Sequence, residues 1–349
     1  MPHPQPDAAM IAAAAPAIRF QLDTPLLMVV VDTEEAFDWN APFDRASVAV
    51  DSIAAQPLAH EIFAPHGLRP TYVIDYPVAT TPSSVAVLKG LLDAGHCQIG
   101  AHLHTWVNPP FDEPVSPATS YAGNLAPALE RAKIRHLTEA IAANFDASPT
   151  IYKAGRYGVG PATAGILRAL GYRIDLSVLP HTNLSRDGGP DFRPCSARPY
   201  WVGTPGELLE IPVTRGFYGL AERWGGAADA AVRSRHARRL RLPGLASRLG
   251  VLERTTLTPE GVDFATQRRL VRGMLRQGHR VFTITYHSPS LAPGNTPYVR
   301  NRADLERFLA NLRALMGYFF GELGARPTTP EELRALALAT TEQPAPTSS

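Results

Sequence analysis

The segment LLMVVVDTEE, residues 26–35, places six consecutive apolar residues directly before a cluster of three acidic side chains. A short apolar run that is rich in valine is typical of a strand buried on both faces. The carboxyl ends of parallel strands are where α/β folds carry their binding and catalytic groups. The run Leu26–Val31 therefore predicts a buried strand that delivers Asp32 and Glu34 to a functional site.

Further apolar runs of strand length follow along the chain, and helix-like segments separate them. The strand-like runs are Thr71–Ile74, Gln98–Ala101, Ile151–Ala154, Ile174–Leu176, Leu208–Ile211 and Phe282–Tyr286. The helix-like segments include Ser83–Ala94, Leu125–Asn144, Ala162–Leu170 and Phe264–Gln277. This alternation indicates an α/β fold with parallel strands and crossover helices. Seven strands in one series favour a closed or nearly closed barrel over a doubly wound sheet, although composition does not decide between the two.

The composition excludes several classes of protein. The chain has 349 residues, of which 45% are apolar and 19% charged, so it can bury a large core. The net charge of +2 gives no electrostatic case for nucleic-acid binding. Two cysteines do not make a disulfide framework, and no run of 18 apolar residues predicts a membrane span. The N-terminus lacks a basic region before its alanine-rich stretch, so we expect a cytoplasmic protein without a signal peptide.

Domain organisation follows from these patterns. We expect a single barrel domain over residues 21–335, with a disordered leader at 1–20 and a disordered tail at 336–349. The strand–helix rhythm breaks over residues 216–260, where we expect a helical insertion. Residues 230–252 hold six arginines and no acid. This segment is either a solvated helical surface, or a basic lid that contacts an anionic substrate or a membrane surface.

Two histidines with one residue between them, His102 and His104, follow another of the strand-like runs. Side chains at positions i and i+2 of a strand point to the same face. Two imidazoles on one face form half of a metal site, and Asp32 and Glu34 can supply its carboxylates. The alternative is that each histidine makes only a local hydrogen bond and that Asp32 caps a helix.

Two more strand ends carry polar residues. Arg156 lies in the turn KAGRYG, residues 153–158, where it either pairs with a catalytic carboxylate or lies on the surface. His287 follows the last strand-like run, where it either acts as a general acid or caps the next loop. Asp175 also falls at a strand end. The common position of these polar residues predicts one active site at the carboxyl end of the strands.

In this order the motifs resemble those of the polysaccharide deacetylase family of carbohydrate esterases. The matching stretches are VVDTE at residues 30–34, GAHLH at 100–104, GRY at 155–157 and TYH at 285–287. The stretches DTEEAFDW, HLHTW and HSPSL are similar to those of a bacterial subgroup associated with lipopolysaccharide synthesis. The resemblance implies a distorted (β/α)₇ barrel of the polysaccharide deacetylase type that removes N-acetyl groups from an amino sugar in a glycan or glycolipid.

The resemblance also implies a divalent metal, for which we expect Zn²⁺. Glu34 stands where the family has its metal-binding aspartate, and His102 matches the first metal-binding histidine. The family's second histidine comes four residues after the first, where this chain has Trp106. We therefore assign His104 as the third ligand, on the strand-spacing argument.

The catalytic roles carried over by position are those of five residues. Asp32 matches the catalytic base and His287 the general acid. Arg156 matches the residue that orients the base, and Tyr157 falls where a backbone N–H helps to hold the oxyanion. Asp175 lies near the position that tunes the acid.

Two other functions stay open. One is a metal-independent hydrolase of cyclic amides or ureides with the same fold, which would keep Asp32 and His287 but would not need Glu34. The other is a catalytically silent barrel that binds a glycan. Neither the acceptor sugar nor the oligomeric state follows from the sequence.

Overall fold

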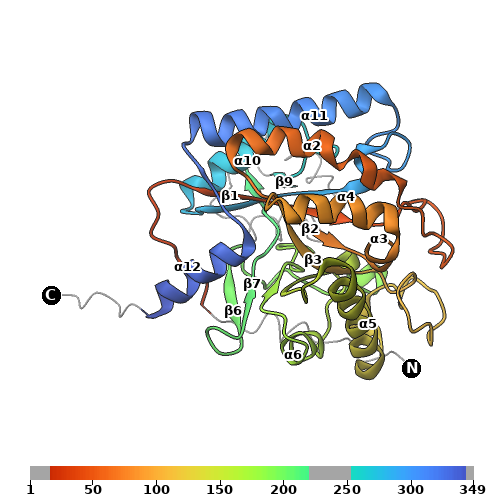
Figure 1. Cartoon of the computed structure of the whole chain (residues 1–349). Coiled ribbons are helices and arrows are strands. Elements are labelled where there is room, and N and C mark those ends of the chain that lie inside the picture. The colour runs from red at the N-terminus through yellow and green to blue at the C-terminus, as the bar shows by residue number, and fades with distance from the viewer. Residues whose placement is uncertain (1–15, 220–252, 343–349) are drawn as a thin grey trace, which may run out of the picture.

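A computed structural model describes residues 16–219 and 253–342, and within them the chain forms one curled parallel sheet surrounded by helices (Figure 1). The parallel strands follow the order β10-β1-β2-β3-β4-β5-β7. Their bounds are β1 Leu26–Thr33, β2 Thr71–Ile74, β3 Gln98–Leu103, β4 Ile151–Ala154, β5 Ile174–Asp175, β7 Leu208–Glu210 and β10 Val281–His287. All seven predicted strands are therefore present, and the expected distorted (β/α)₇ barrel is confirmed.

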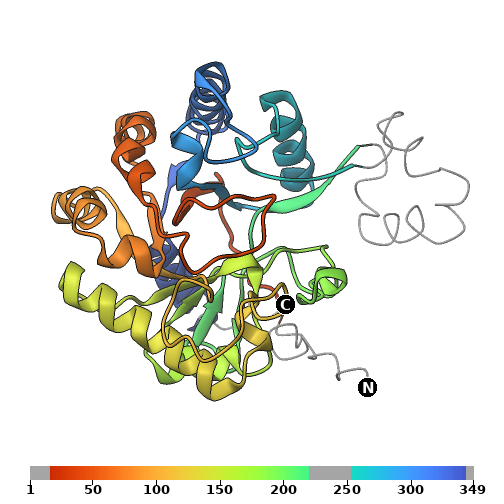
Figure 2. The same cartoon turned by 90° about the vertical axis from the view of Figure 1, so that its right-hand side faces the viewer.

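Helices cover the outside of this sheet, as expected for right-handed crossovers between parallel strands (Figure 2). They are α2 Gln56–Phe63, α3 Tyr76–Thr80, α4 Pro82–Asp93, α5 Pro127–Phe145, α6 Thr163–Ala169, α10 Phe264–Arg276 and α11 Arg302–Met316. A further helix, α12 Pro330–Glu342, lies at one end of the barrel. Short helical turns lie at 51–55, 64–66, 122–124, 155–157, 185–187 and 288–291, and a π-helical stretch at 317–322 continues α11. The glycines after α4, α6 and α10 have the left-handed backbone conformation that ends these helices.

The alternation of side chains along β1 separates two apolar clusters. Leu27, Val29 and Val31 face outward and belong to the large cluster between the sheet and the helices. Leu26, Met28 and Val30 face the other way and form a smaller cluster inside the barrel. Because the period of a strand is two, Asp32 continues the inward series. The apolar interior of the barrel therefore ends in a carboxylate at the carboxyl end of β1.

The ring of strands is closed by segments outside the seven strands. The short strand β6 (Tyr200–Val202) pairs antiparallel with β7 and ends the sheet on that side. Between β7 and β10, Thr214 Oγ1 accepts a hydrogen bond from the backbone N–H of Thr283, and the carbonyl of Leu257 accepts one from Thr285. These bonds satisfy backbone groups of β10 that a neighbouring strand would otherwise pair.

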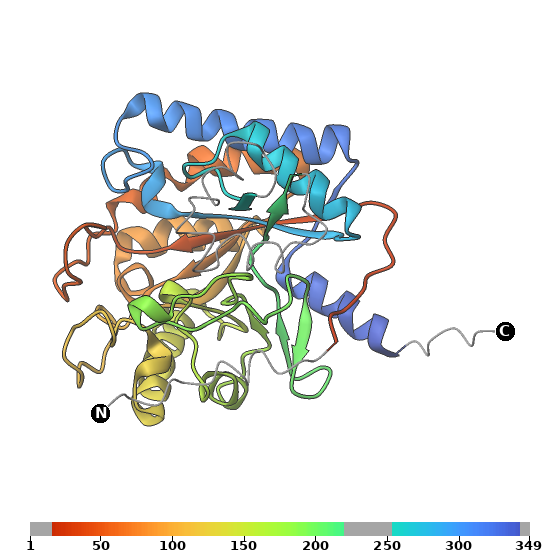
Figure 3. The same cartoon turned by 180° about the vertical axis from the view of Figure 1, so that it is seen from behind.

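Helix α12 covers the amino ends of the strands, the end of the barrel opposite to Asp32 (Figure 3). Leu333 and Ala337 are buried in the inner cluster together with Leu26 and Leu209. The predicted disordered tail at 336–349 is therefore wrong for residues 336–342, because burial of this apolar face stabilises the helix. Ile18 also packs against the inner cluster, so the predicted leader is ordered from residue 16 in the described part of the chain.

The expected helical insertion at 216–260 is not helical where it is described. Its two ends form an antiparallel hairpin of β8 (Arg215–Tyr218) and β9 (Glu253–Thr256). Residues 220–252, which contain the arginine-rich stretch, lie outside the described residues. Within the described ranges, no helix combines the length and the apolar character that a membrane crossing requires.

Candidate active site

The inward-facing positions of four strands bring polar side chains together at the carboxyl end of the barrel. Asp32 follows the apolar residues of β1, Lys153 follows Ile151 in β4, and His287 ends β10. His102 lies in β3, with His104 two residues beyond it. Asp32, Glu34, His102 and His104 are all at most 4% exposed. The structure thus unites most of the predicted site residues in one buried group.

Asp32 pairs with Lys153, and not with Arg156 as predicted. The ammonium Nζ lies 2.5 Å from Oδ1 and 2.7 Å from Oδ2 of the carboxylate, and 3.3 Å from Thr285 Oγ1. Burial opposes ionisation of Asp32, but the charges of Lys153, His102 and His287 outweigh it and lower the pKa of the carboxyl. Asp32 is therefore ionised at neutral pH and can accept a proton.

Arg156 lies at the rim, where its guanidinium donates to Ser120 Oγ and to the carbonyl of Pro117. The guanidinium also packs over the rings of Phe43 and Tyr121. The prediction that Arg156 orients the base is wrong. Position 153 is the position of β4 that faces Asp32, and Lys153 occupies it. Arg156 links the loops around the barrel mouth instead.

The backbone at the end of β4 is unusual. Arg156 and Tyr157 have φ values of 55° and 60°, so two consecutive residues other than glycine adopt the left-handed region. Such residues cost about 1–3 kcal/mol each and cluster at functional sites. The ring of Tyr157 lies over Lys153, with Nζ 5.4 Å from the ring centroid. This strained turn brings the ring of Tyr157 over Lys153, the residue that pairs with Asp32.

His287 is held by Glu260, a residue for which the sequence predicted no role. Nδ1 of His287 lies 2.8 Å from Glu260 Oε2, and its backbone N–H donates to Oε1 at 3.1 Å. The other ring nitrogen, Nε2, lies 3.8 Å from Asp32 Oδ2. Burial lowers the pKa of the imidazole, but the carboxylates of Glu260, Glu34 and Asp32 raise it to about 10. His287 is thus protonated at neutral pH and can donate a proton.

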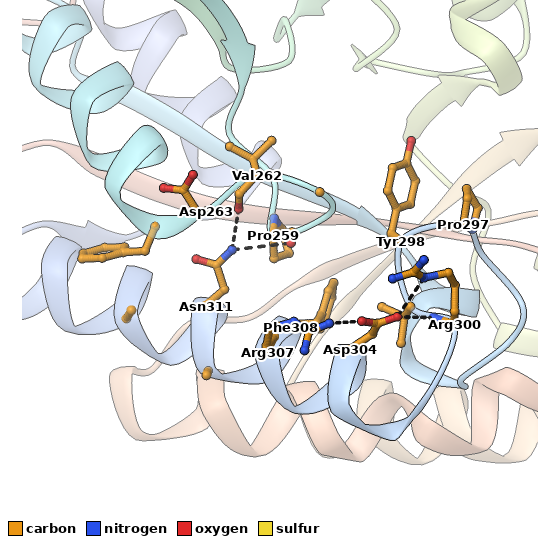
Figure 4. Close-up of a pocket in the computed structure, with 15 residues that line it drawn as sticks. Pro259, Val262, Asp263, Pro297, Tyr298, Arg300, Asp304, Arg307, Phe308 and Asn311 are labelled. Carbon is orange, nitrogen blue, oxygen red and sulfur yellow. Dashed lines mark hydrogen bonds and ion pairs between the residues drawn. The ribbon is translucent and has the colours of Figure 1, made fainter.

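Helix α11 fixes the loop that carries Glu260, as Figure 4 shows. Asn311 donates from Nδ2 to the carbonyl of Val262 at 2.7 Å and to that of Pro259 at 3.5 Å. Its Oδ1 accepts from Gln267 Nε2 at 3.1 Å. The carboxylate of Glu260 also accepts a hydrogen bond from Ser290. Hydrogen bonds from Asn311 on both sides of Glu260 therefore hold the loop whose carboxylate orients His287.

Glu34, His102 and His104 form a group with the geometry of a three-ligand metal site. Glu34 Oε2 lies 3.4 Å from His102 Nε2 and 3.3 Å from His104 Nε2. These separations are long for charge-assisted hydrogen bonds, which are about 2.7–2.9 Å. They match the edge of a tetrahedron with metal–ligand bonds of about 2.0–2.2 Å, which is roughly 3.3–3.5 Å. Glu34 Oε1 is buried and has no partner among the described residues.

The other nitrogens of both histidines are bonded so that Nε2 is left for a metal. His102 Nδ1 lies 3.1 Å from the carbonyl of Lys153, which can only accept, so the proton of a neutral His102 is on Nδ1. His104 Nδ1 lies 2.8 Å from Glu35 Oε2. Burial lowers the pKa of His104, which favours the neutral, ligating form. Metal-binding histidines are typically oriented by such outer hydrogen bonds.

Glu35 connects His104 to Trp106, the residue at the position of the family's second histidine. The indole N–H of Trp106 donates to Glu35 Oε1 at 2.8 Å, and its ring stacks on that of His104 at 4.3 Å. Asp75 accepts from the backbone N–H of Glu35 at 2.7 Å. Burial raises the pKa of Glu35 to about 8 and that of Asp75 well above its usual value. Glu35 therefore supports His104 from behind, on the side away from Nε2.

The approach of β4 to His104 requires a glycine at position 155. A Cβ on Gly155 would lie 2.4 Å from His104 Cδ2 and 2.4 Å from the carbonyl oxygen of Leu103. Both distances are far below van der Waals contact. The strand end can therefore come this close to the imidazole only without a side chain at this position.

Asp175 lies outside the site, contrary to the prediction. Its neighbours Ile174 and Leu176 face the barrel interior, so Asp175 faces outward between the sheet and the helices. There it pairs in register with Glu210 of β7 and accepts from Ser177. Burial raises the pKa of Asp175 to about 6 and that of Glu210 well above its usual value. Glu260, not Asp175, contacts His287.

Comparison with known proteins supports the fold and leaves the family open. No protein-family model matches the sequence, and no curated protein does so significantly. Among solved structures, a protein provisionally assigned as a polysaccharide deacetylase from Mycobacterium smegmatis aligns with a TM-score of 0.51 and 16% identity, over 96% of this chain and 98% of that one. The allantoinase PuuE aligns with a TM-score of 0.53 and 14% identity, over 99% of both chains. Likeness at such low identity establishes a shared barrel fold and no more.

Proposed function

We propose that this protein is a metal-dependent hydrolase that removes N-acetyl groups from an amino sugar in a glycan or glycolipid. The observation that carries the proposal is the pairing of Asp32 with His287. Their side chains lie 3.8 Å apart, and their environments shift their pKa values in opposite directions. A carboxylate that stays ionised beside an imidazolium that stays protonated is the arrangement of a base and an acid that act in one reaction.

The proposed reaction needs one proton acceptor and one proton donor. Asp32 takes a proton from the water that attacks the acetamide carbonyl, and Lys153 stabilises the carboxylate before the transfer. When the C–N bond breaks, Nε2 of His287 gives its proton to the leaving amine. The products are acetate and a free amino sugar, and the two side chains exchange their protonation states until solvent restores them.

Glu34, His102 and His104 would hold a divalent ion, and their mixed nitrogen and oxygen ligands suit Zn²⁺. When bound, the ion would polarise the carbonyl and lower the pKa of water. The Tyr157 N–H, presented by the strained turn, is our candidate donor to the developing oxyanion. Position and burial support the roles of Glu34, His102 and His104, and the left-handed turn supports that of Tyr157.

The decisive experiment measures acetate release from N-acetylated glycans and from a lipopolysaccharide precursor, with and without a chelator. The resemblance to the lipopolysaccharide-associated subgroup motivates the second substrate. We expect release that a chelator abolishes and zinc restores. Full activity of H102A would contradict the ligand assignment.

The same experiment separates two other functions. Hydrolysis of allantoin by metal-free protein would favour the cyclic-amide hydrolase, whose fold is shared by one of the aligned structures. Glycan binding without acetate release, unaffected by D32N, would favour a silent binding barrel. A cytoplasmic location and contact of residues 230–252 with a membrane remain predictions.

A further inference from the structure

Lysine is rare in this chain, and two of its lysines are buried. Of the 34 lysines and arginines, only Lys89, Lys133 and Lys153 are lysines. Lys153 pairs with Asp32 in the candidate active site, and Lys133 of α5 is completely buried outside that pair. An ammonium group is a compact charge with three donors, whereas a guanidinium is a planar fork. A buried lysine in a chain that otherwise uses arginine therefore indicates a place that requires a compact cation.

Four oxygen atoms surround the ammonium of Lys133. Nζ lies 2.9 Å from the carbonyl oxygen of Thr105, 2.6 Å from that of Asn108 and 2.7 Å from that of Pro110. The fourth oxygen is Glu113 Oε1, at 2.9 Å. Carbonyl and carboxylate oxygens are the ligands that cations such as K⁺ take from proteins. The ammonium has three hydrogens for four oxygens, and the one carboxylate balances its single charge, so this oxygen cage has the composition of a monovalent-cation site.

All four oxygens belong to the segment 105–113, which begins directly after His104. Trp106 of this segment stacks on the imidazole of His104 at 4.3 Å, and its indole N–H donates to the carboxylate that orients this histidine. Asn108 adds a bond back to α5, from its Nδ2 to the carbonyl of Lys133 at 3.0 Å. The oxygen cage therefore fixes to α5 the segment that supports a candidate metal ligand.

The same segment holds the loop 36–47, which crosses the mouth of the barrel (Figure 2). Arg45 of that loop donates to the carbonyls of Phe111 and Glu113, and its guanidinium lies 4.9 Å from the centroid of the Phe111 ring. Two aromatic side chains of the loop lie over the site, one against His104 and one against the acid. The oxygen cage is thus connected to both loops at the barrel mouth.

We propose that Lys133 is a positioning residue whose ammonium serves as a built-in monovalent cation, and that the four oxygens around it form a cation site. The oxygen cage closes around this charge and so fixes the segment 105–113 in the conformation that supports His104 and receives Arg45. The inference goes beyond the proposed function and does not depend on the reaction. Its direct consequence is that K⁺ or NH₄⁺ can replace the side chain when the ammonium is removed.

Hydrogen exchange of the metal-free full chain tests this with Lys133→Ala. We expect the backbone amides of residues 105–113, and to a smaller extent those of 36–47, to exchange at least about tenfold faster than in wild type, because their anchor is lost. An excess of KCl or NH₄Cl should restore slow exchange in the variant. Choline chloride at the same concentration should not, because its cation is too large for the oxygen cage. Exchange of α12, at the opposite end of the barrel, should not change.

Three further variants separate the cage from charge alone. Lys133→Arg keeps the charge without the compact shape, so both loops should exchange faster and K⁺ should not correct this. Lys133→Ala combined with Glu113→Gln lacks the carboxylate that balances the ion, and K⁺ should restore little. Lys89→Ala, which removes a surface lysine of α4, is the matched control and should leave the exchange of both loops unchanged.

Zinc titration of the same proteins measures the connection to His104. Lys133→Ala should bind zinc at least about tenfold more weakly than wild type, and K⁺ should recover most of the loss. Because hydrogen exchange is measured without metal, a wild-type protein that binds no zinc would contradict the proposed function and leave the exchange result to decide this inference.

Normal exchange of 105–113 in Lys133→Ala would overturn the inference, as would an equal response to K⁺ and choline. Faster exchange throughout the chain, α12 included, would assign Lys133 to general stability and would also overturn it. If Lys133→Ala does not fold in choline chloride, folding in KCl supports the inference, and failure to fold in both salts contradicts it.

Discussion

Lys153 of β4 contacts both carboxylate oxygens of Asp32, at 2.5 and 2.7 Å. Both side chains are almost completely buried, so each charge depends on the other for compensation. An isolated buried charge is costly, whereas a neutral side chain of similar size in the same place is not. The pair therefore couples the stability of the barrel to the ionised state of the base.

Lys153→Met should lower the free energy of unfolding by about 3–5 kcal/mol, because it leaves the buried carboxylate of Asp32 without the ammonium group that hydrogen-bonds to both of its oxygens. The pKa of Asp32 should rise, and activity at pH 7 should fall at least about a hundredfold. Urea unfolding and acetate release measure the two effects. Adding D32N to Lys153→Met should restore much of the stability and none of the activity. A double variant no more stable than Lys153→Met alone would contradict the coupling.

Metal analysis tests the ligand set directly. We expect purified protein to bind zinc through Glu34, His102 and His104, and each substitution to alanine to weaken binding at least tenfold. Glu35→Gln should weaken it by about 10–100-fold, since it alters the bond that orients His104. His136→Ala, on the outer face of α5, is the matched control. Unchanged zinc content in H102A and H104A would exclude this site.

The close approach of β4 to His104 predicts a strong effect of a single methyl group. Gly155→Ala should displace either the imidazole of His104 or the end of β4. The new Cβ would lie 2.4 Å from His104 Cδ2 and 2.4 Å from the carbonyl oxygen of Leu103. Zinc affinity and activity should fall together. Gly165→Ala in α6 is the control, since nothing lies within 4 Å of its Cβ, and it should stabilise the protein by about 0.5–1 kcal/mol. A Gly155→Ala protein with normal zinc binding would show that the strand end can shift without cost.

The sequence predicted the seven strands well because each is a short buried apolar run bounded by turns. Side-chain parity, used for His102 and His104, could have gone further. Counting in steps of two from Ile151 places Lys153 inside the barrel, and the same count from Ile174 places Asp175 outside it. The resemblance suggested Arg156 and Asp175 by motif position. The count in steps of two would have replaced Arg156 with Lys153 as the partner of Asp32, and it would have excluded Asp175 from the site.

Glu260 was beyond the reach of this reasoning. It lies on a loop 27 residues before His287 and next to a break in the strand–helix rhythm, with no periodic pattern to orient it. Its position depends on Asn311 of α11, a contact between segments far apart in the sequence. Loops bonded through such distant contacts carry no local signal. The ring-closing role of Thr214 and Leu257 was missed for the same reason.

The Asp175–Glu210 pair predicts a pH-dependent stability that is separate from catalysis. The raised pKa of Glu210 means that folding takes up a proton at neutral pH, so stability is greatest below the unfolded pKa of about 4.3 and falls as pH rises above it. Glu210→Gln removes this proton uptake and keeps an oxygen for the N–H of Val178. Urea unfolding should show little difference from wild type at pH 4.5 and a gain of at least about 1 kcal/mol at pH 8. If wild type and Glu210→Gln were equally stable at both pH 4.5 and pH 8, Glu210 would be ionised in the folded protein.

The final prediction concerns the acid. If Glu260 keeps His287 protonated, activity should persist at pH values well above the ordinary histidine pKa, until the imidazole loses its proton. Glu260→Gln removes the nearest negative charge, so the alkaline limb of the pH–rate profile should move down toward the ordinary histidine value of about 6.5. The rate at pH 9 should then fall at least about tenfold, with a smaller loss at pH 6. Glu139→Gln, on the exposed face of α5, controls for the loss of one acidic charge and should leave the profile unchanged. A uniform loss at all pH values would assign Glu260 to orientation of His287 without control of its protonation.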